Sequence, residues 1–340
     1  MLPNLIEKLR CPRCRLALVF RDSQGPSSQT DEGILRCDPC GGEYPIIGGI
    51  PRFVSSGGYA ETFGRQWRTF HREQLDSFSG TTLSHDRFYQ VTRWRPEELA
   101  GKWVLDVGCG AGRFAEIALE AGANVIAMDI SSSVEACYDN LIQRFPDRLH
   151  VVQASIYEMP FEAESFEYVY CIGVIQHTPD PLAAGDAVAR MSRPNGRMGL
   201  WIYERRWCSF LGIYAWKYGL RIITRHLSFR ENYLFAFALT AMFWPIWYPL
   251  MHAGPLGKAL LFWLPVPARA YAGEGYGLRD VFRCVAMDTL DMYSPAYDNP
   301  QRYADVVRTL QRNGHWDIVR TCTGLGLAAV RRKSLDRQCP

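Results

Sequence analysis

The first residues suited to chemistry are four cysteines, which occur as two Cys-x-x-Cys pairs. Cys11 and Cys14 form one pair and Cys37 and Cys40 the other, with twenty-two residues between the pairs. This spacing is close to that of four-cysteine zinc sites. Four thiolates form a closed tetrahedral ligand set, so we expect a structural Zn²⁺ rather than a catalytic one. Four unrelated reduced cysteines are the alternative.

A second candidate site is a glycine-rich turn that directly follows an apolar run. The run Trp103–Val107 contains Asp106 and leads into a turn with glycines at positions 108, 110 and 112. Asp129 ends the next apolar run, about twenty positions later. Glycines let a backbone approach a ligand closely, and a carboxylate in this place accepts hydrogen bonds from ribose hydroxyls. The pattern predicts a nucleotide-like cofactor.

Candidate catalytic residues lie where two further segments are expected to reach the same edge of a sheet. His177 follows the strand-like run Tyr168–Ile172, and the ordinary pKa of histidine suits a general base. A loop histidine that only packs or caps is an equally good interpretation. Asp291 and Tyr293 lie in a polar and aromatic segment before the last predicted helix, where we expect them to face the substrate.

These residues must be positioned by an alternation of short apolar strands and amphipathic helices. Such an alternation predicts an α/β fold, with a parallel sheet and helices on both faces. The expected strands are Trp103–Val107, Asn124–Met128, Leu149–Gln153, Tyr168–Ile172 and Arg197–Tyr203. After a long interruption, the pattern is completed by a helix over Gln301–Arg312 and by strands over Trp316–Thr321 and Leu325–Arg331.

The chain therefore divides into four parts, of which the second begins at the linker-like Ser55–Gly58. We expect a metal-binding unit over 1–54, a helical linker over 55–98, a sheet domain over 99–203 and 300–334, and a mainly helical insertion over 204–299.

The insertion contains Tyr233–Met251, nineteen residues without a charge, which is long enough to cross a bilayer. A single span would put strands of one sheet on opposite sides of the membrane, and Pro245 and Pro249 are expected to break a regular helix. We expect a hydrophobic lid over the site, or an interfacial helix pair on a bilayer. Aromatic residues that only build the insertion's own core are the alternative. The basic residues that would suit anionic headgroups are Arg221, Arg225, Arg230 and Lys258.

Composition limits the class of protein. The 340 residues carry a net charge of +3, which is too small to indicate nucleic-acid binding through bulk charge. Eleven cysteines, an odd number, favour a reducing compartment over a disulfide scaffold. The N-terminal segment lacks the apolar core of a signal peptide, so we expect a cytoplasmic protein, with membrane association through the insertion left open.

The glycine turn differs from the nicotinamide-binding version, because its third glycine comes one residue earlier and an aspartate precedes it. Over Leu99–Tyr203 and Pro300–Arg332 the chain resembles the class I S-adenosylmethionine-dependent methyltransferases, in their small-molecule, type 11-like branch. Val151–Phe161 and Ser165–Pro181 resemble the third and fourth motifs of that branch. The resemblance implies a Rossmann-like seven-stranded sheet and S-adenosylmethionine as the methyl donor.

The resemblance also implies which residues hold the cofactor. Asp106 and the glycines would frame its methionine and ribose, Asp129 would hold the ribose, and Ser155 and Ile156 would flank the adenine. Ser155 departs from the family, in which an aspartate is common at this position. Thiol chemistry is conceivable at Cys171 and at the cysteine of the glycine turn, but both are better interpreted as small buried hydrophobic residues. The implied cofactor-binding residues are Asp106, Gly108, Cys109, Gly110, Gly112, Asp129, Ile130, Ser155, Ile156, Cys171 and, from the preceding helix, Gln66.

The segment Leu5–Val54 resembles the small zinc-ribbon family that includes the activating subunit of tRNA methyltransferases. The resemblance to methyltransferases implies that the helical segment over 55–98 closes over the cofactor. With the aromatic insertion as a lid, we expect methyl transfer to a small-molecule or lipid-like acceptor. RNA base methylation, with RNA docked on the ribbon, is the alternative, although no basic stripe with interleaved aromatics is evident. A non-catalytic cofactor-binding scaffold is the third hypothesis.

Overall fold

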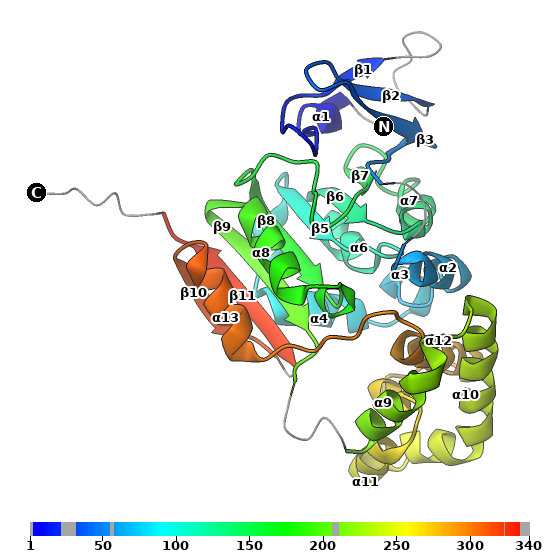
Figure 1. Cartoon of the computed structure of the whole chain (residues 1–340). Coiled ribbons are helices and arrows are strands. Elements are labelled where there is room, and N and C mark those ends of the chain that lie inside the picture. Colours follow the sequence, from blue (N-terminus) through cyan, green and yellow to red (C-terminus); the bar gives the residue numbers. More distant parts are fainter. Residues whose placement is uncertain (1–2, 22–31, 55–57, 206–210, 323, 334–340) are drawn as a thin grey trace, which may run out of the picture.

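The computed structural model describes residues 3–21, 32–54, 58–205, 211–322 and 324–333. Within them the chain forms a small N-terminal sheet, a large central sheet and a helical insertion. The small sheet and the insertion lie at opposite ends of the central sheet (Figure 1). Of the predicted linker, residues 55–57 lie outside the described residues.

The central sheet has seven strands. They are β5 (Trp103–Val107), β6 (Asn124–Asp129), β7 (Leu149–Gln153), β8 (Phe166–Ile172), β9 (Ser192–Ile202), β10 (Trp316–Arg320) and β11 (Leu325–Arg331). Their order is β10-β11-β9-β8-β5-β6-β7. β5 pairs in parallel with β6 and β8, whereas β11 is antiparallel to both β9 and β10. The predicted Rossmann-like α/β fold is therefore confirmed.

Alternate residues of the buried strands point to two separate hydrophobic cores, as the period of a strand requires. The helices that cover the sheet are α4 (Leu83–Thr92), α6 (Arg113–Glu120), α7 (Ser133–Leu141), α8 (Pro181–Met191) and α13 (Tyr303–Arg312). In β5, Val104 packs in the core with α4, α6 and α7, and Leu105 packs in the core with α8 and α13. Helices thus cover both faces (Figure 1).

The N-terminal unit shares a hydrophobic core with the central sheet. Its elements are α1 (Pro3–Ile6), β1 (Val19–Arg21), β2 (Glu32–Cys37), β3 (Gly42–Ile47) and β4 (Ile50–Pro51), whose four strands form an antiparallel sheet. Leu35 and Ile46 are buried in the same cluster as Met159 and Phe161, which follow β7. The backbone N–H of Arg10 donates to the carbonyl of Pro160 at 2.8 Å. The unit therefore shares a hydrophobic core with the sheet domain.

In the sequence, four short helices lie between the small sheet and the central sheet. They are α2 (Glu61–Thr69), α3 (Asp76–Ser79), α4 and α5 (Pro96–Leu99). α2 packs on α7, and Gly64 permits the close approach, because a Cβ there would lie 2.5 Å from Ser132 Oγ.

The insertion is helical and has a core of its own, which includes Trp247, Val285 and Tyr293. Its elements are α9 (Ile213–Thr224), α10 (Phe229–Met251), α11 (Gly254–Leu260), the 3-10 turns η2 (Leu261–Trp263) and η3 (Ala268–Tyr271), and α12 (Leu278–Tyr293).

The prediction that two prolines break the apolar segment is wrong, since α10 runs unbroken through Pro245 and Pro249. The cause is the placement of the prolines. Both are exposed, and so is Ala241, whose carbonyl loses its hydrogen bond to residue 245. The interrupted bonds therefore lie on the open side of the helix, away from α12.

Candidate active site

A cavity of about 700 Å³ lies at the carboxyl ends of β5, β6, β8 and β9, the edge at which α/β sheets bind ligands. Residues of the glycine turn form one side of it. α2 contributes a wall, and α9, η3 and α12 of the insertion contribute another. The cavity therefore joins the predicted cofactor site to the insertion.

The glycine turn has a backbone shape that side chains would prevent. Gly108, Gly110 and Gly112 have φ values of 86°, 52° and 94°, in the left-handed region that favours glycine. A Cβ at Gly108 would lie 2.3 Å from a methyl group of Val174. Gly108, Cys109 and Gly110 line the cavity, whereas Gly112 packs toward Leu141.

Asp129, at the end of β6, ties the glycine turn to the neighbouring loop. One carboxylate oxygen accepts the N–H of Gly110 at 3.1 Å, and the other accepts the N–H and hydroxyl of Ser131 at 2.9 and 2.8 Å. Burial raises the pKa of this carboxyl group. Asp129 and Ile130 both line the cavity, and each carboxylate oxygen has two lone-pair positions, so the group retains capacity for a ribose hydroxyl.

Gln66 on α2 is the strongest indication of a bound ligand. Its side chain is fully buried and lines the cavity, and neither its amide oxygen nor its amide nitrogen has a partner in the part of the chain that the structure describes. Buried amides are rarely left unpaired. The next residue, Trp67, lies 3.2 Å from where a Cβ of Gly110 would be, so α2 covers the glycine turn closely.

Several other predicted cofactor residues do not line the cavity. Asp106 is buried under the turn, and burial raises its pKa to about 8. Ser155 accepts the N–H of Tyr157 at 3.2 Å, and Cys171 is fully buried in the sheet core, where it acts as a small hydrophobic residue. Ile156 does line the cavity.

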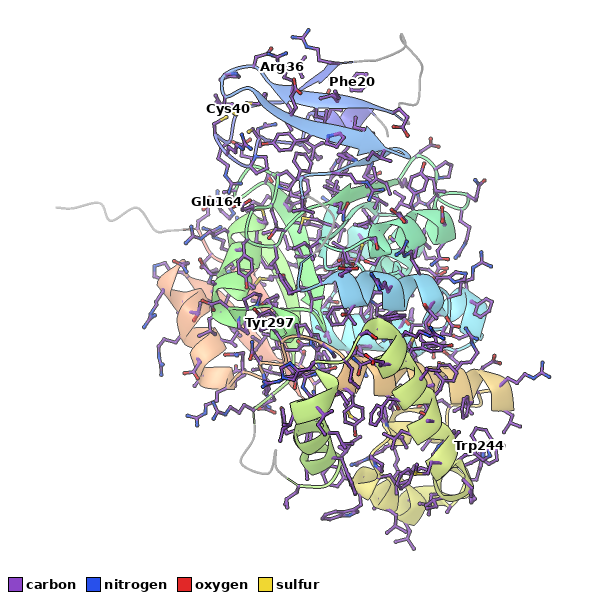
Figure 2. The ribbon with its side chains drawn as sticks, turned by 45° about the vertical axis from the view of Figure 1, so that its right-hand side comes forward. Phe20, Arg36, Cys40, Glu164, Trp244 and Tyr297 are labelled. Carbon is purple, nitrogen blue, oxygen red and sulfur yellow. The ribbon has the colours of Figure 1, made fainter. Side chains whose placement is uncertain are left out.

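His177 lies in the cavity wall with a defined protonation state. Its Nδ1 is 3.1 Å from the carbonyl oxygen of Tyr297, and because a carbonyl only accepts, Nδ1 carries the proton. Tyr297 lies between the sheet and the insertion (Figure 2). Burial lowers the pKa of His177, so the ring is neutral near pH 7 and Nε2 is the basic nitrogen.

The two predicted residues on α12 are separated by the structure. Asp291 lines the cavity, and its carboxylate accepts the hydroxyl of Tyr203 at 3.4 Å. Tyr293 lies in the core of the insertion instead, where its hydroxyl donates to the carbonyl of Pro265 at 2.8 Å. Residues two positions apart on a helix point in different directions, so both could not face the same space.

The structure adds polar residues that the sequence reasoning missed. Asp288 lines the cavity one helical turn before Asp291, and Tyr271 donates to its carboxylate at 2.7 Å. Burial raises the pKa of Asp288 to about 6. Lys217 of α9 lines the same end, 4.7 Å from the ring centre of Tyr203. The sequence held two signals for these residues. One is the (i, i+3) spacing of Asp288 and Asp291, and the other is the presence of Lys217 among the aromatic residues of α9.

The four predicted metal ligands lie together at one side of the N-terminal unit, where Figure 2 labels Cys40. All four sulfur atoms are within 4.8 Å of one another. Cys11 Sγ lies 3.5 Å from Cys40 Sγ, and Cys14 Sγ lies 3.3 Å from Cys37 Sγ. A cluster of four thiols at such distances has the donor set and the compactness that tetrahedral Zn²⁺ requires.

Residues 105–200 match a family model described as a methyltransferase domain. Over these residues the central sheet is similar to a methyltransferase domain. The matched segment contains the glycine turn, Asp129 and His177, and it excludes the N-terminal cysteines and the insertion. The methyl donor of this family is S-adenosylmethionine.

Curated relatives of the methyltransferase domain include two proteins named ubiquinone biosynthesis O-methyltransferase. The one from Aromatoleum aromaticum is 30% identical over 129 residues, which cover 37% of this chain and 55% of the relative. The one from Xanthomonas oryzae is 28% identical over 149 residues, which cover 40% of this chain and 58% of the relative. The chain thus spans about half the length of these relatives.

Among solved structures, the phosphoethanolamine N-methyltransferase 2 of Haemonchus contortus, in complex with S-adenosylhomocysteine, is 23% identical with a TM-score of 0.38. The likeness covers 48% of this chain and 39% of that chain.

Proposed function

We propose that this protein transfers a methyl group from S-adenosylmethionine to a hydroxyl group of a small, largely apolar acceptor. The observation that carries the proposal is the cavity itself, which joins the glycine turn to the inner face of the insertion. The relatives' name, ubiquinone biosynthesis O-methyltransferase, favours a hydroxyl on a quinone-precursor type of molecule.

The residues at the sheet edge fit the cofactor. Asp129 has acceptor capacity for the ribose, Ile130 and Ile156 offer apolar contact to the adenine, and the unpaired amide of Gln66 suits a polar group of the methionine part. S-adenosylmethionine supplies a methyl group on a sulfonium that is already activated. The protein must therefore mainly hold the acceptor in line and exclude water.

His177 is the proposed general base. Its Nδ1–H is held by the carbonyl of Tyr297, which leaves Nε2 free to accept the proton of the acceptor hydroxyl. Tyr203, Asp288 and Asp291 line the insertion end of the cavity and are proposed to orient polar substituents of the acceptor.

We also propose that Cys11, Cys14, Cys37 and Cys40 bind one structural Zn²⁺. The four thiolates fill all positions of a tetrahedron, so the ion would have no open site for substrate. Its role would be to stabilise the N-terminal unit and, through the shared core, the sheet beneath it.

The test is label partitioning. Full-length protein and methyl-labelled S-adenosylmethionine are incubated with host extract, which is then separated into organic-soluble, small polar and nucleic-acid fractions. We expect label in the organic-soluble or small polar fraction, lost with Asp129→Asn. Label mainly in RNA would overturn the proposal in favour of RNA methylation. Retained cofactor binding without label in any fraction would favour the scaffold hypothesis.

A further inference from the structure

Helix α9 buries its polar side and exposes its apolar side, which is the reverse of an ordinary surface helix. Its buried residues are Lys217, Arg221 and Thr224, all of them polar. Its apolar residues Ile222 and Ile223 are 68% and 65% exposed. A helix on a soluble protein buries its apolar stripe and exposes its polar face. The inverted arrangement indicates that the surroundings of the outer face of α9 are apolar.

The polar face of α9 is held in place by partners within the protein. Lys217 forms an ion pair with Asp298 at 2.8 Å, and both side chains are almost completely buried. The guanidinium of Arg221 donates to the carbonyl of Pro295 at 2.8 Å. Since rotation of the helix would leave these two charges without partners in a buried place, the apolar side cannot turn inward.

Helices α9, α10 and α11 lie together at the end of the molecule farthest from the N-terminal unit (Figure 1), and α10 and α11 also carry exposed apolar side chains. We call this exposed apolar surface the tip surface. On α10, only 22% of the most apolar 18-residue stretch is buried. The exposed residues between 234 and 249 are all apolar. The residues of the tip surface used in the argument are Trp216, Ile222, Ile223, Met242, Leu256 and Trp263.

The charge around the tip surface is strongly one-sided. Residues 211–273 contain six basic residues, of which Lys217 and Arg221 are buried, and one acidic residue, Glu231. The carboxylate of Glu231 accepts the N–H of Ser228 at 2.7 Å in a helix cap. Arg225, Arg230 and Lys258 are exposed on these helices. Apolar side chains within a fringe of basic groups are complementary to a membrane surface that contains anionic lipids.

We propose that the tip surface docks in the interfacial layer of an anionic lipid bilayer. The apolar side chains of α9, α10 and α11 enter the boundary of the acyl chains, and the basic residues contact the headgroups. The chain does not cross the membrane, because α10 packs lengthwise on α12 and because β9 and β11, on either side of the insertion, pair in one sheet.

The cavity wall and the tip surface share helix α9. Tyr214 and Tyr218 line the cavity and are also exposed among the apolar residues of α9. Docking therefore places this wall of the cavity at the bilayer. An apolar acceptor enters the cavity from the membrane rather than from water, an inference that rests on the proposed methyl transfer.

Vesicle co-sedimentation of the full chain, without cofactor, tests the docking. We expect binding to vesicles of phosphatidylcholine with phosphatidylglycerol and weak binding to phosphatidylcholine alone. The double variant Ile222→Gln/Ile223→Gln should lower binding about tenfold, and Arg225→Gln/Lys258→Gln about fivefold or more on the mixed vesicles only. Val319→Gln is the matched control, because Val319 is 59% exposed on β10, away from the insertion.

Two results would overturn the docking. One is an absence of wild-type binding to the mixed vesicles, or equal binding by Ile222→Gln/Ile223→Gln. The other is a lipid-free dimer, seen by sedimentation velocity, that this double variant dissociates, because a second copy would then cover the tip surface. Calorimetric titration with S-adenosylmethionine should be unchanged in the double variant, so a failure of docking is distinguishable from a failure of the proposed activity.

Discussion

The buried amide of Gln66 has a cost to the free protein and a use in the bound one. Each unpaired polar group costs about 1–3 kcal/mol of folding free energy. A cofactor that paired with the amide would recover this energy, so we expect Gln66 to couple cofactor binding to stability. Burial acts in a comparable way on His177, where it disfavours the charged ring and so keeps a base available.

Replacing Gln66 with leucine should therefore have opposite effects on the two states. Gln66→Leu removes the unpaired groups, so we expect a higher Tm without cofactor, together with an affinity for S-adenosylmethionine about tenfold lower. Thermal unfolding and calorimetric titration measure the two effects. An unchanged affinity would show that the amide does not contact the cofactor.

His177→Asn tests the base while keeping an N–H that can reach the carbonyl of Tyr297. Methyl transfer should fall by about 10²–10⁴-fold, the usual contribution of a general base, while S-adenosylmethionine binds with unchanged affinity. Equal losses of binding and turnover would instead assign the residue a packing role.

The pH profile gives an independent check of the same residue. Because burial lowers the pKa of His177, the neutral, basic form persists below the ordinary histidine value of 6.5. We expect the acidic limb of kcat/KM to lie below pH 6.5 and to disappear in His177→Asn. A limb above pH 6.5 would contradict a desolvated base.

At the scale of elements, the N-terminal unit and the central sheet are linked by packing. β2 and β3 bury side chains in the same cluster as the loop after β7, so the cysteine site stabilises more than its own strands. Removal of the metal should therefore weaken the sheet as well.

Cys37→Ser, or a strong chelator, should lower the Tm of the whole chain in a single transition. A loss of about 4 kcal/mol corresponds to roughly 10 °C for a domain of this size. Differential scanning calorimetry, with metal analysis of the purified protein, measures it. Two separate transitions, with the sheet unaffected, would argue that the units fold independently.

The sequence allowed the strands, the glycine turn and the cysteine cluster to be predicted, because each depends on local pattern. β5 and β6 are apolar runs that end at the glycine turn and at Asp129, and the pairing of their ends follows from parallel topology. The insertion end of the cavity could not be derived in this way. Lys217 and Asp288 reach it through packing between α9, α12 and the sheet, which no local pattern encodes.

At the scale of the whole molecule, one buried carboxyl group links stability to pH. The pKa of Asp106 is about 8 in the folded protein, because burial penalises its charge, and near 3.9 when unfolded. Between these values the folded state holds a proton that the unfolded state has lost. The contribution of Asp106 to folding stability is therefore fully present below about pH 4, and it is lost as the pH rises through about 8.

For this reason the cofactor-free protein should be less stable at pH 8 than at pH 6.5, by about 1–2 kcal/mol from Asp106. Asp106→Asn stays neutral throughout and should show a smaller decline. Urea unfolding at the two pH values measures it. The same decline in wild type and variant would assign the effect to other groups.

The pairing of β9 with β11 also has a consequence for the order of folding. Arg197 pairs with Val330, so the edge of the sheet stays open while more than a hundred further residues are synthesised. During that interval the apolar helices of the insertion have already left the ribosome, and the hydrogen-bonding groups on one edge of β9, the edge opposite β8, have no strand beside them. Aggregation should be most acute at this stage of synthesis, when an exposed strand edge and apolar helices coexist. A membrane that received the insertion early would shelter the nascent chain until its last strand arrived.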